Sequence, residues 1–361
     1  MKYLLKKILI IGLLSSCHSC ADQTHPRGPR EKLVIHYAGD ADDVEFKMLG
    51  GPSQVLVRDS LSGDFEGAIE IPSLEEAIFT YEIGLYKKDS MGKMRELEPD
   101  QTLIKLNDRD AIKKRDRFIW IGKKRKGEYE TNEELVGSLV TESIASKFLG
   151  EERRITVYTP REVSSKVPLI YFTDGGIVEI YAPYIDYLIS TNRIQPIVLI
   201  GVHSSRSNRY KEYVKGVGTN ELFRKHQAFF YKEVLAVEES KIKDWRGQRY
   251  LYGYSNGAAF CMHEGINNPG AFSEIIAFST ADYISELARW LNPIKFTFDA
   301  YPKFYMGAGR YEESIFKSSV EFVDVLKANE VEVDFKEFIS GHDSNVWRIE
   351  FLEYVENQFR N

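Results

Sequence analysis

Residues 249–262 read RYLYGYSNGAAFCM, a short apolar run followed by the pattern Gly-x-Ser-x-Gly and then by small and apolar residues. The first part predicts a buried strand and the last part a helix, so the serine falls on the turn between them. Gly253 and Gly257 leave room for the chain to reverse sharply beside neighbouring backbone. Such a turn carries Ser255 at the rim of a sheet and directs the amino end of a helix toward it, where negative charge is stabilised.

Strand-like and helical patterns alternate from about residue 152 to the end of the chain. This alternation predicts an α/β fold with a largely parallel sheet covered on both faces, in which ligands bind at the carboxyl ends of the strands. The predicted strands are Arg154–Tyr158, Leu169–Thr173, Ile197–Val202, Tyr250–Tyr254, Glu274–Ser279, Phe304–Gly307 and Val333–Ile339. The predicted helices are Phe229–Ser240, Gly257–Asn267, Ser314–Asn329 and Asn345–Phe359.

A serine hydroxyl is a poor nucleophile near neutral pH and needs a base. Of the seven histidines, His342 is best placed, because it follows the last predicted strand and precedes the final helix. Gly341 allows that loop to turn toward Ser255. His203 also follows a predicted strand at the same rim and is the competing candidate.

The acid that orients such a histidine should follow the strand Phe304–Gly307. Glu312 and Glu313 both lie there, and because adjacent side chains point in different directions only one of them is expected at the site. Glu312 is preferred, and Asp343 and Asp299 are remoter alternatives.

Stabilising an oxyanion requires two backbone N–H groups. One is expected from Asn256, the residue after the serine, and the other from an earlier strand end. Asp174-Gly175-Gly176 follows the strand Leu169–Thr173, and its small residues let the backbone approach a ligand. The N–H of Gly176 is therefore the second expected donor.

The first third of the chain has a different hydrophobic pattern, in which apolar and polar residues alternate, as in Val44-Glu45-Phe46-Lys47-Met48. Turn signals such as Gly50-Gly51-Pro52 interrupt the alternation. Residues 32–108 are therefore predicted to form a small all-β sandwich. Residues 109–139 are interpreted as a linker to the α/β domain of residues 140–361.

The first 16 residues combine lysines, a short apolar run and small residues before Cys17. This arrangement predicts a secretory signal peptide, and its last residues resemble the bacterial lipobox, which implies lipidation of Cys17. Cleavage near Ala21 to give a plain secreted protein is the alternative. Residues 17–31 would form a flexible tether, anchoring the protein by lipid to the outer membrane of a bacterial cell envelope, on its periplasmic or outer side.

The composition is that of a globular protein, with 43% hydrophobic residues and a formal net charge of −6. The acidic balance argues against nucleic acid as a partner. Two basic runs, 113–117 and 123–126, fit a solvated strand edge or, alternatively, a face toward anionic lipid. The chain has no histidine pair at metal-ligand spacing and no phosphate-binding glycine loop, so no metal or nucleotide cofactor is expected. The oligomeric state is left open.

The residues around Ser255 and His342 resemble an esterase family that includes enterochelin esterases, bacterial feruloyl esterases, S-formylglutathione hydrolases and mycolyltransferases. The matching pieces span about residues 140–361 and are Arg154–Pro160, Tyr171–Gly175, Arg209–Tyr213, the serine turn, Gly341–Asp343 and Trp347-Arg348. The resemblance implies an α/β-hydrolase domain with a mostly parallel sheet, in which Ser255 is the nucleophile, His342 the base and Glu312 the acid. Residues 32–108 resemble the immunoglobulin-like modules that precede catalytic domains in many exported esterases.

The expected function is that of an exported serine carboxylesterase acting on a small-molecule siderophore ester or an acylated polysaccharide. An acyltransferase on the same scaffold and a non-catalytic surface binding protein are the alternatives. Substrate contacts are expected from Tyr254, Arg206, Arg310 and Trp347. Arg209 and Glu212 also match the family pattern and are interpreted as a structural pair.

Overall fold

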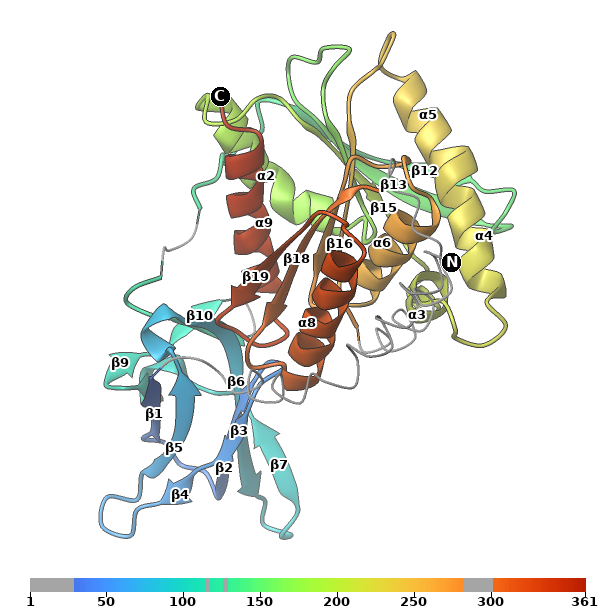
Figure 1. The fold of residues 1–361 in the computed structure, drawn as a ribbon. Helices are drawn as coiled ribbons and strands as arrows, with labels where there is room; N and C mark the ends of the chain where they lie inside the picture. Colours follow the sequence, from blue (N-terminus) through green and yellow to red (C-terminus); the bar gives the residue numbers. More distant parts are fainter. Residues whose placement is uncertain (1–28, 115–116, 126–128, 282–300) are drawn as a thin grey trace, which may run out of the picture.

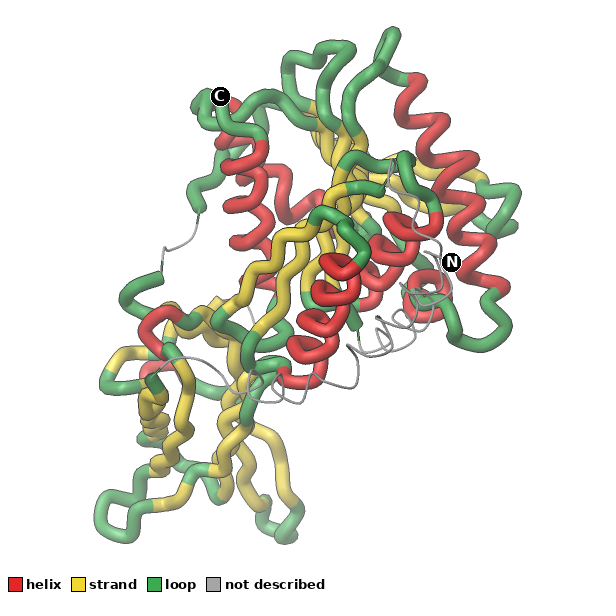
Figure 2. Tube along the Cα trace, in the orientation of Figure 1, coloured by secondary structure: helices red, strands yellow, loops and turns green. Residues whose placement is uncertain are grey.

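The computed structural model describes residues 29–114, 117–125, 129–281 and 301–361. Two β-sheets form the N-terminal part, and a large sheet flanked by helices forms the C-terminal part (Figures 1 and 2). The signal peptide, Cys17, most of the tether and Asp299 lie outside the described residues. No helix in the described ranges combines the length and apolarity needed to cross a membrane.

The two N-terminal sheets pack around one apolar core. Within the described residues, the first contains β1 (Arg30–Tyr37), β4 (Val57–Arg58), β5 (Phe65–Pro72), β8 (Ile104–Leu106) and β9 (Arg109–Asp110). The second contains β2 (Asp43–Met48), β3 (Ser53–Val55), β6 (Ile78–Lys88), β7 (Met94–Leu97), β10 (Ile112–Lys114) and β11 (Arg117–Ile121). Two short 3-10 turns, Leu74–Glu76 and Gln101–Leu103, connect strands. Ile35 of β1 and Phe46 of β2 belong to the same buried cluster, as the alternating pattern requires.

The β region extends further than the sequence predicted. The predicted end at residue 108 and the linker over 109–139 are wrong in their first part, because β11 pairs with β6 and places Ile119 opposite Thr80. Phe118, Ile119 and Trp120 are all buried, so this strand is covered on both faces and does not alternate. The sequence analysis did not recognise β11 as a core strand, because basic residues flank it on both sides.

The C-terminal sheet has, in the described residues, eight strands in the order β12-β13-β15-β14-β16-β17-β18-β19. Their bounds are β12 (Ser138–Ala145), β13 (Glu152–Thr159), β14 (Leu169–Phe172), β15 (Val198–Val202), β16 (Arg249–Tyr254), β17 (Glu274–Phe278), β18 (Lys303–Gly309) and β19 (Val333–Phe338). The first two pairings are antiparallel and the remaining ones are parallel, so the sheet is mixed, with a parallel part from β15 to β19. All seven strands predicted for this domain are present, whereas β12 was not predicted.

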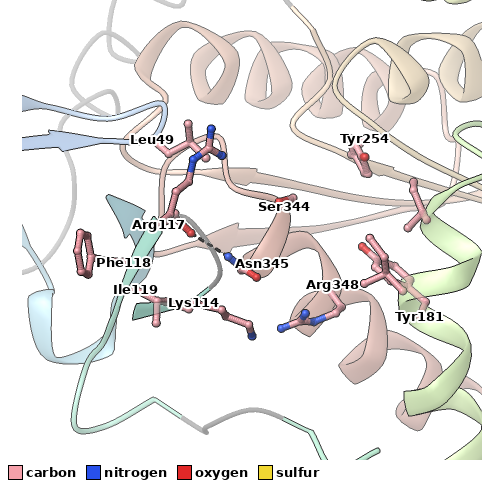
Figure 3. A pocket seen from close by; sticks show the side chains of 13 residues that line it. Leu49, Lys114, Arg117, Phe118, Ile119, Tyr181, Tyr254, Ser344, Asn345 and Arg348 are labelled. Atoms are coloured by element: carbon pink, nitrogen blue, oxygen red, sulfur yellow. Dashed lines mark hydrogen bonds between the residues drawn. The ribbon is translucent and has the colours of Figure 1, made fainter. Parts of the chain in front are cut away.

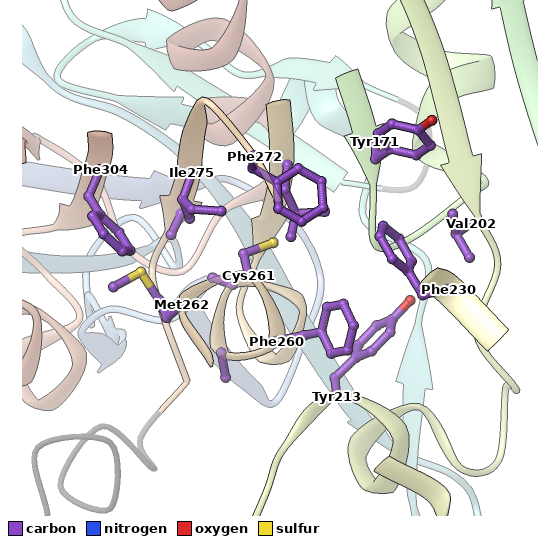
Figure 4. Packing of buried hydrophobic residues seen from close by; sticks show 14 of the residues in the cluster. Tyr171, Val202, Tyr213, Phe230, Phe260, Cys261, Met262, Phe272, Ile275 and Phe304 are labelled. Carbon is purple, nitrogen blue, oxygen red and sulfur yellow. The ribbon is translucent and has the colours of Figure 1, made fainter. Parts of the chain in front are cut away.

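Helices cover both faces of this sheet (Figure 1). One face carries α2 (Ile177–Ser190) and α9 (Ser344–Gln358). The other carries α4 (Glu221–Phe229), a π-helical turn (Phe230–Val234), α5 (Leu235–Ser240), α6 (Asn256–Asn267) and α8 (Glu313–Ala328), with the short α3 (Arg209–Tyr213) beside α4 and α6. Figure 4 shows how Phe260, Cys261 and Met262 of α6 pack among aromatic and aliphatic side chains on this second face. Both faces of the parallel strands are therefore buried.

Candidate active site

Ser255 sits on a strained turn between β16 and α6. Its backbone has φ 54° and ψ −125°, a conformation that residues with a Cβ rarely adopt. A Cβ on Gly253 would overlap the backbone of Gly257, and a Cβ on Gly257 would overlap the hydroxyl of Thr173. Both glycines of the motif are thus required by close packing, which holds the serine in this conformation.

Three polar side chains meet at the carboxyl ends of β16, β18 and β19. Nε2 of His342 lies 3.1 Å from Oγ of Ser255, and its Nδ1 lies 2.6 Å from Oε2 of Glu312. These are hydrogen-bond distances on both sides of one imidazole ring. The structure therefore brings together the three residues that the sequence singled out, which come from positions 255, 312 and 342.

The second oxygen of Glu312 is fully engaged. Oε1 accepts the N–H of Gly309 at 2.6 Å and the hydroxyl of Ser279, which in turn accepts the indole N–H of Trp347 at 2.8 Å. These donors leave Oε2 directed at His342. Glu313, in contrast, is exposed at the start of α8, so of the two adjacent glutamates only Glu312 reaches the imidazole.

Two aromatic rings form a wall of the pocket at Ser255. Tyr254 and Trp347 stack with ring centroids 4.3 Å apart, and the rings of Trp347 and His342 lie nearly perpendicular with centroids 4.6 Å apart. The cavity has a volume of about 320 Å³. It is lined by Leu49, Arg209, Tyr254, Ser255, His342, Ser344 and Trp347. Tyr254 and Trp347 are therefore placed where the sequence prediction of substrate contacts requires them.

The other two predicted substrate contacts are not at this pocket. Arg310 follows β18, but its guanidinium binds Glu337 on the neighbouring strand β19, because parallel pairing sets Arg310 close to that side chain. Arg206 is exposed in the connection between β15 and α3. Neither residue is among the described residues that line the cavity at Ser255.

The predicted oxyanion donors begin two helices beside the serine. Asn256 is the first residue of α6, where the opening N–H groups have no helical acceptor, and Gly176 is the N-cap residue of α2. The N–H of Gly175 is already used by the carbonyl of Val202, at 3.1 Å. The amides of Asn256 and Gly176 therefore remain the expected donors, whereas that of Gly175 already has an acceptor.

Arg209 connects the two loops that carry these amides. Its Nε and Nη2 donate to the carboxylate of Asp174 at 2.6 and 2.7 Å, and its Nη1 donates to Oδ1 of Asn256 at 3.0 Å. Burial disfavours the charged guanidinium, but the bonds to Asp174 outweigh this and raise the pKa of Arg209. The predicted pairing of Arg209 with Glu212 is wrong, because the Glu212 carboxylate binds Arg153.

Replacing Arg209 by lysine is expected to lower kcat for an ester by about 10²-fold, because a single ammonium cannot hold both loops in place. Steady-state kinetics with a chromogenic ester measure the change. Arg224→Lys is the matched control, since Arg224 is exposed and its partner among the described residues is the carbonyl of Thr219, just before its own helix. Equal kcat values for the two variants would contradict a role of Arg209 in shaping the site.

His203, the competing candidate for the base, has a different place. Its Nε2 lies 2.8 Å from Oγ1 of Thr156, and its ring packs so closely against Gly175 that a Cβ there would overlap it. Burial lowers the pKa of His203, which favours the neutral ring. His203 therefore packs against the loop that carries Gly175.

A second, smaller cavity of about 160 Å³ adjoins the first and involves the N-terminal sheets (Figure 3). Leu49, Tyr254 and Ser344 line both cavities. Strand β11 contributes Phe118 and Ile119 to the smaller one, and α2 and α9 form the opposite side. The sequence did not predict that the N-terminal strands line this cavity, because these strands lie far from the serine turn along the chain.

The described ranges hold no group of three or more His, Cys, Asp or Glu side chains arranged to bind a metal ion.

Comparison with family models gives one match, over part of the α/β domain. Residues 146–305 match the family model described as putative esterase, a segment that includes Ser255 and ends before Glu312 and His342. The match resembles the esterase pattern read from the residues around Ser255, and it supports ester hydrolysis as the activity. No match was found among curated protein sequences.

Solved structures of esterases share the fold. Ferric enterobactin esterase from Salmonella typhimurium superposes with a TM-score of 0.65 at 12% identity, covering 93% of this chain and 97% of that one. Enterochelin esterase from Shigella flexneri gives 0.64 at 12% identity, with 94% and 97% covered. A ferulic acid esterase gives 0.50 at 16% identity, with 62% and 98% covered. At these identities the likeness concerns the fold, and the two enterobactin enzymes share nearly its whole extent.

Proposed function

We propose that this protein is a serine carboxylesterase that works through an acyl-enzyme. One observation carries the proposal: a single imidazole, that of His342, lies within hydrogen-bond distance of both Ser255 and Glu312. Nucleophile, base and acid in this order and geometry are the groups that acyl transfer uses. The strained backbone of Ser255 supports the same interpretation, because strain of this kind concentrates at functional sites.

The reaction begins when Oγ of Ser255 attacks the ester carbonyl while Nε2 of His342 takes the hydroxyl proton. The carbonyl oxygen becomes an oxyanion, which the N–H groups of Asn256 and Gly176 stabilise. When the carbon–oxygen bond to the alcohol breaks, the imidazolium returns its proton to the leaving oxygen. Water then attacks the acyl-enzyme by the same route, which releases the acid and restores Ser255.

Glu312 holds the ring in its working orientation. Its carboxylate accepts the Nδ1–H of His342, so Nε2 is the nitrogen without a proton and faces Ser255. The same carboxylate stabilises the imidazolium that forms in each step. A single backbone donor to the oxyanion, such as the N–H of Asn256 or Gly176, stabilises the transition state by about 3–4 kcal/mol. The rate acceleration is therefore shared between these amides and the imidazole.

The substrate that the fold comparison favours is a siderophore ester. The likeness to the enterobactin enzymes extends over nearly the whole chain, including the N-terminal sheets, whereas the ferulic acid esterase covers less than two thirds of it. The smaller cavity beside Ser255 adds aromatic and cationic side chains, among them Tyr181, Phe118 and Arg117. An acylated polysaccharide is the second substrate class.

Enterobactin and a feruloylated arabinoxylan fragment separate these classes in one assay. We expect hydrolysis of a short p-nitrophenyl ester, which any accessible serine esterase performs, and a kcat/KM at least about tenfold higher for enterobactin than for ferulate release. The reverse order would assign the polysaccharide class. Transfer of the acyl group to an added sugar would indicate an acyltransferase, and no turnover of any ester would indicate a binding protein.

Export and lipid anchoring at Cys17 complete the proposal. They rest on residues 1–17 alone, where the charged start, the apolar run and the small residues precede the cysteine. Incorporation of labelled fatty acid into the protein, and its loss in Cys17→Ser, tests the anchor.

A further inference from the structure

The loop between β2 and β3 touches the backbone of the loop that carries His342. Gly50 has φ +63°, and a Cβ at this position would overlap both the Cβ and the backbone N of His342. The contact is reciprocal, because a Cβ on Gly341 would overlap the carbonyl of Leu49. Neither loop can therefore bear a side chain where they meet, and the N-terminal sheets lie directly against the backbone and Cβ of His342.

A buried polar cluster fixes the same loop from a second direction. Asp343 accepts the backbone N–H of Thr80 on β6 and, at 2.8 Å, that of Asn345. The side-chain amide of Asn345 donates to Oγ1 of Thr80 at 2.9 Å, the dashed line in Figure 3. Asp343 has no exposed surface, and its burial raises the pKa of the carboxyl group. This cluster joins β6 to the start of α9, immediately after His342.

The loop that carries Glu312 is also held by the N-terminal sheets. The hydroxyl of Tyr311, the preceding residue, donates to the carbonyl of Pro72 at 2.7 Å. The N–H of Ile78 donates to the carbonyl of Ile339 at 3.1 Å, just before the His342 loop. Ser255, in contrast, is held by contacts within the α/β domain, through Gly253, Gly257 and Thr173.

We infer that the N-terminal sheets are a positioning element of the active site, which holds His342 against Ser255 through Gly50 and the Thr80–Asp343–Asn345 cluster. This inference rests on the proposed esterase function. None of these groups touches the reacting atoms, so each acts through the imidazole. The expected effect is large, because a displacement of about 1 Å at a reacting group lowers the rate by about 10²-fold.

Gly50→Ala tests the inference against Gly63→Ala. Both glycines have positive φ, +63° and +81°, so alanine imposes a similar backbone strain at each, but nothing lies within 4 Å of a Cβ at position 63. We expect Gly50→Ala to lower kcat for a p-nitrophenyl ester by about 10²-fold, with KM changed less than about threefold. We expect Gly63→Ala to keep the kcat of the wild type. The thermal midpoints of the two variants verify that both are folded at the assay temperature.

A second pair of variants covers the case in which Gly50→Ala does not fold. Thr80→Val keeps the shape and the backbone N–H but removes the acceptor of Asn345, whereas Thr102→Val removes an exposed hydroxyl that donates to Asp100. We expect only Thr80→Val to lower kcat, by about tenfold, and to slow covalent labelling of Ser255 by a fluorophosphonate to the same extent. The labelling rate reports the activation of the serine and does not depend on product release.

The outcomes separate the inference from the proposed function. If the wild type hydrolyses esters and the kcat values of Gly50→Ala and Thr80→Val equal those of their controls, the inference is overturned and the esterase function stands. If the wild type hydrolyses no ester and is not labelled, both fail. A parallel loss of kcat and labelling rate in folded variants supports the positioning role.

Discussion

Ser255→Ala is expected to lower kcat for a short p-nitrophenyl ester by about 10⁶-fold, to the level that binding and the oxyanion donors alone supply. The variant removes the only atom that forms the acyl-enzyme, while the imidazole and the amides keep their positions. Alanine at this site retains the Cβ and the strained backbone, so the loss concerns chemistry and not the fold. Steady-state kinetics and a fluorophosphonate that labels active serines measure it directly.

Ser273→Ala is the matched control for this experiment, because Ser273 is an exposed serine just before β17. The wild type and this control should take up one fluorophosphonate group per chain, and Ser255→Ala none. Mass spectrometry locates the group. Turnover or labelling that survives in Ser255→Ala would show that another residue is the nucleophile, and the proposed mechanism would be wrong.

Glu312→Gln is expected to lower kcat by about 10⁴-fold, the effect of the equivalent replacement in a well-known Ser-His-Asp triad. The glutamine amide can donate to Nδ1 of His342, which favours a proton on Nε2, the nitrogen that must accept the serine proton. Gly309 and Ser279 then face an amide in place of a carboxylate. KM should change little, because Glu312 does not line the cavity at Ser255 within the described residues.

Glu313→Gln provides the control that this site offers, since it makes the same chemical change one residue further along. Glu313 is exposed, so its replacement should leave kcat within about twofold of the wild type. If Glu312→Gln retains more than about a tenth of the activity, the enzyme works with Ser255 and His342 alone, and the carboxylate is structural.

The parts of the site that follow strands could be predicted from sequence. Ser255 lies in a local pattern whose glycines have a steric cause, and that cause is visible in the structure at Gly253 and Gly257. His342 and Glu312 follow β19 and β18, and both strands were predicted close to their observed bounds. Because parallel strands bring their carboxyl ends to one edge, order along the chain was sufficient to bring these three residues together.

Side-chain partners across the fold could not be predicted in the same way. Arg209 was assigned to Glu212, three positions away on one short helix, but the guanidinium turns to Asp174 on another loop. The choice depends on which carboxylate lies beside the serine turn, which a linear pattern does not contain. The prediction that Arg310 contacts the substrate was wrong for the same reason, because its partner Glu337 belongs to another strand.

The contact between the N-terminal sheets and the His342 loop was also beyond the sequence pattern. Gly50 looked like an ordinary turn glycine, and its close approach to His342 depends on residues almost three hundred positions apart. Strand β11 could not be predicted either, because a strand buried on both faces lacks the apolar–polar alternation by which strands are recognised.

The bond between Thr80 and Asp343 spans 263 positions and has a consequence for biosynthesis. The N-terminal sheets precede His342 in the chain, so during synthesis the proposed nucleophile, Ser255, is made 87 positions before the proposed base. On the proposed mechanism, a product truncated between Ser255 and His342 lacks the base and is expected to be inert as a hydrolase. On the proposed mechanism, activity therefore requires the segment that carries His342 to dock onto strands that were made much earlier.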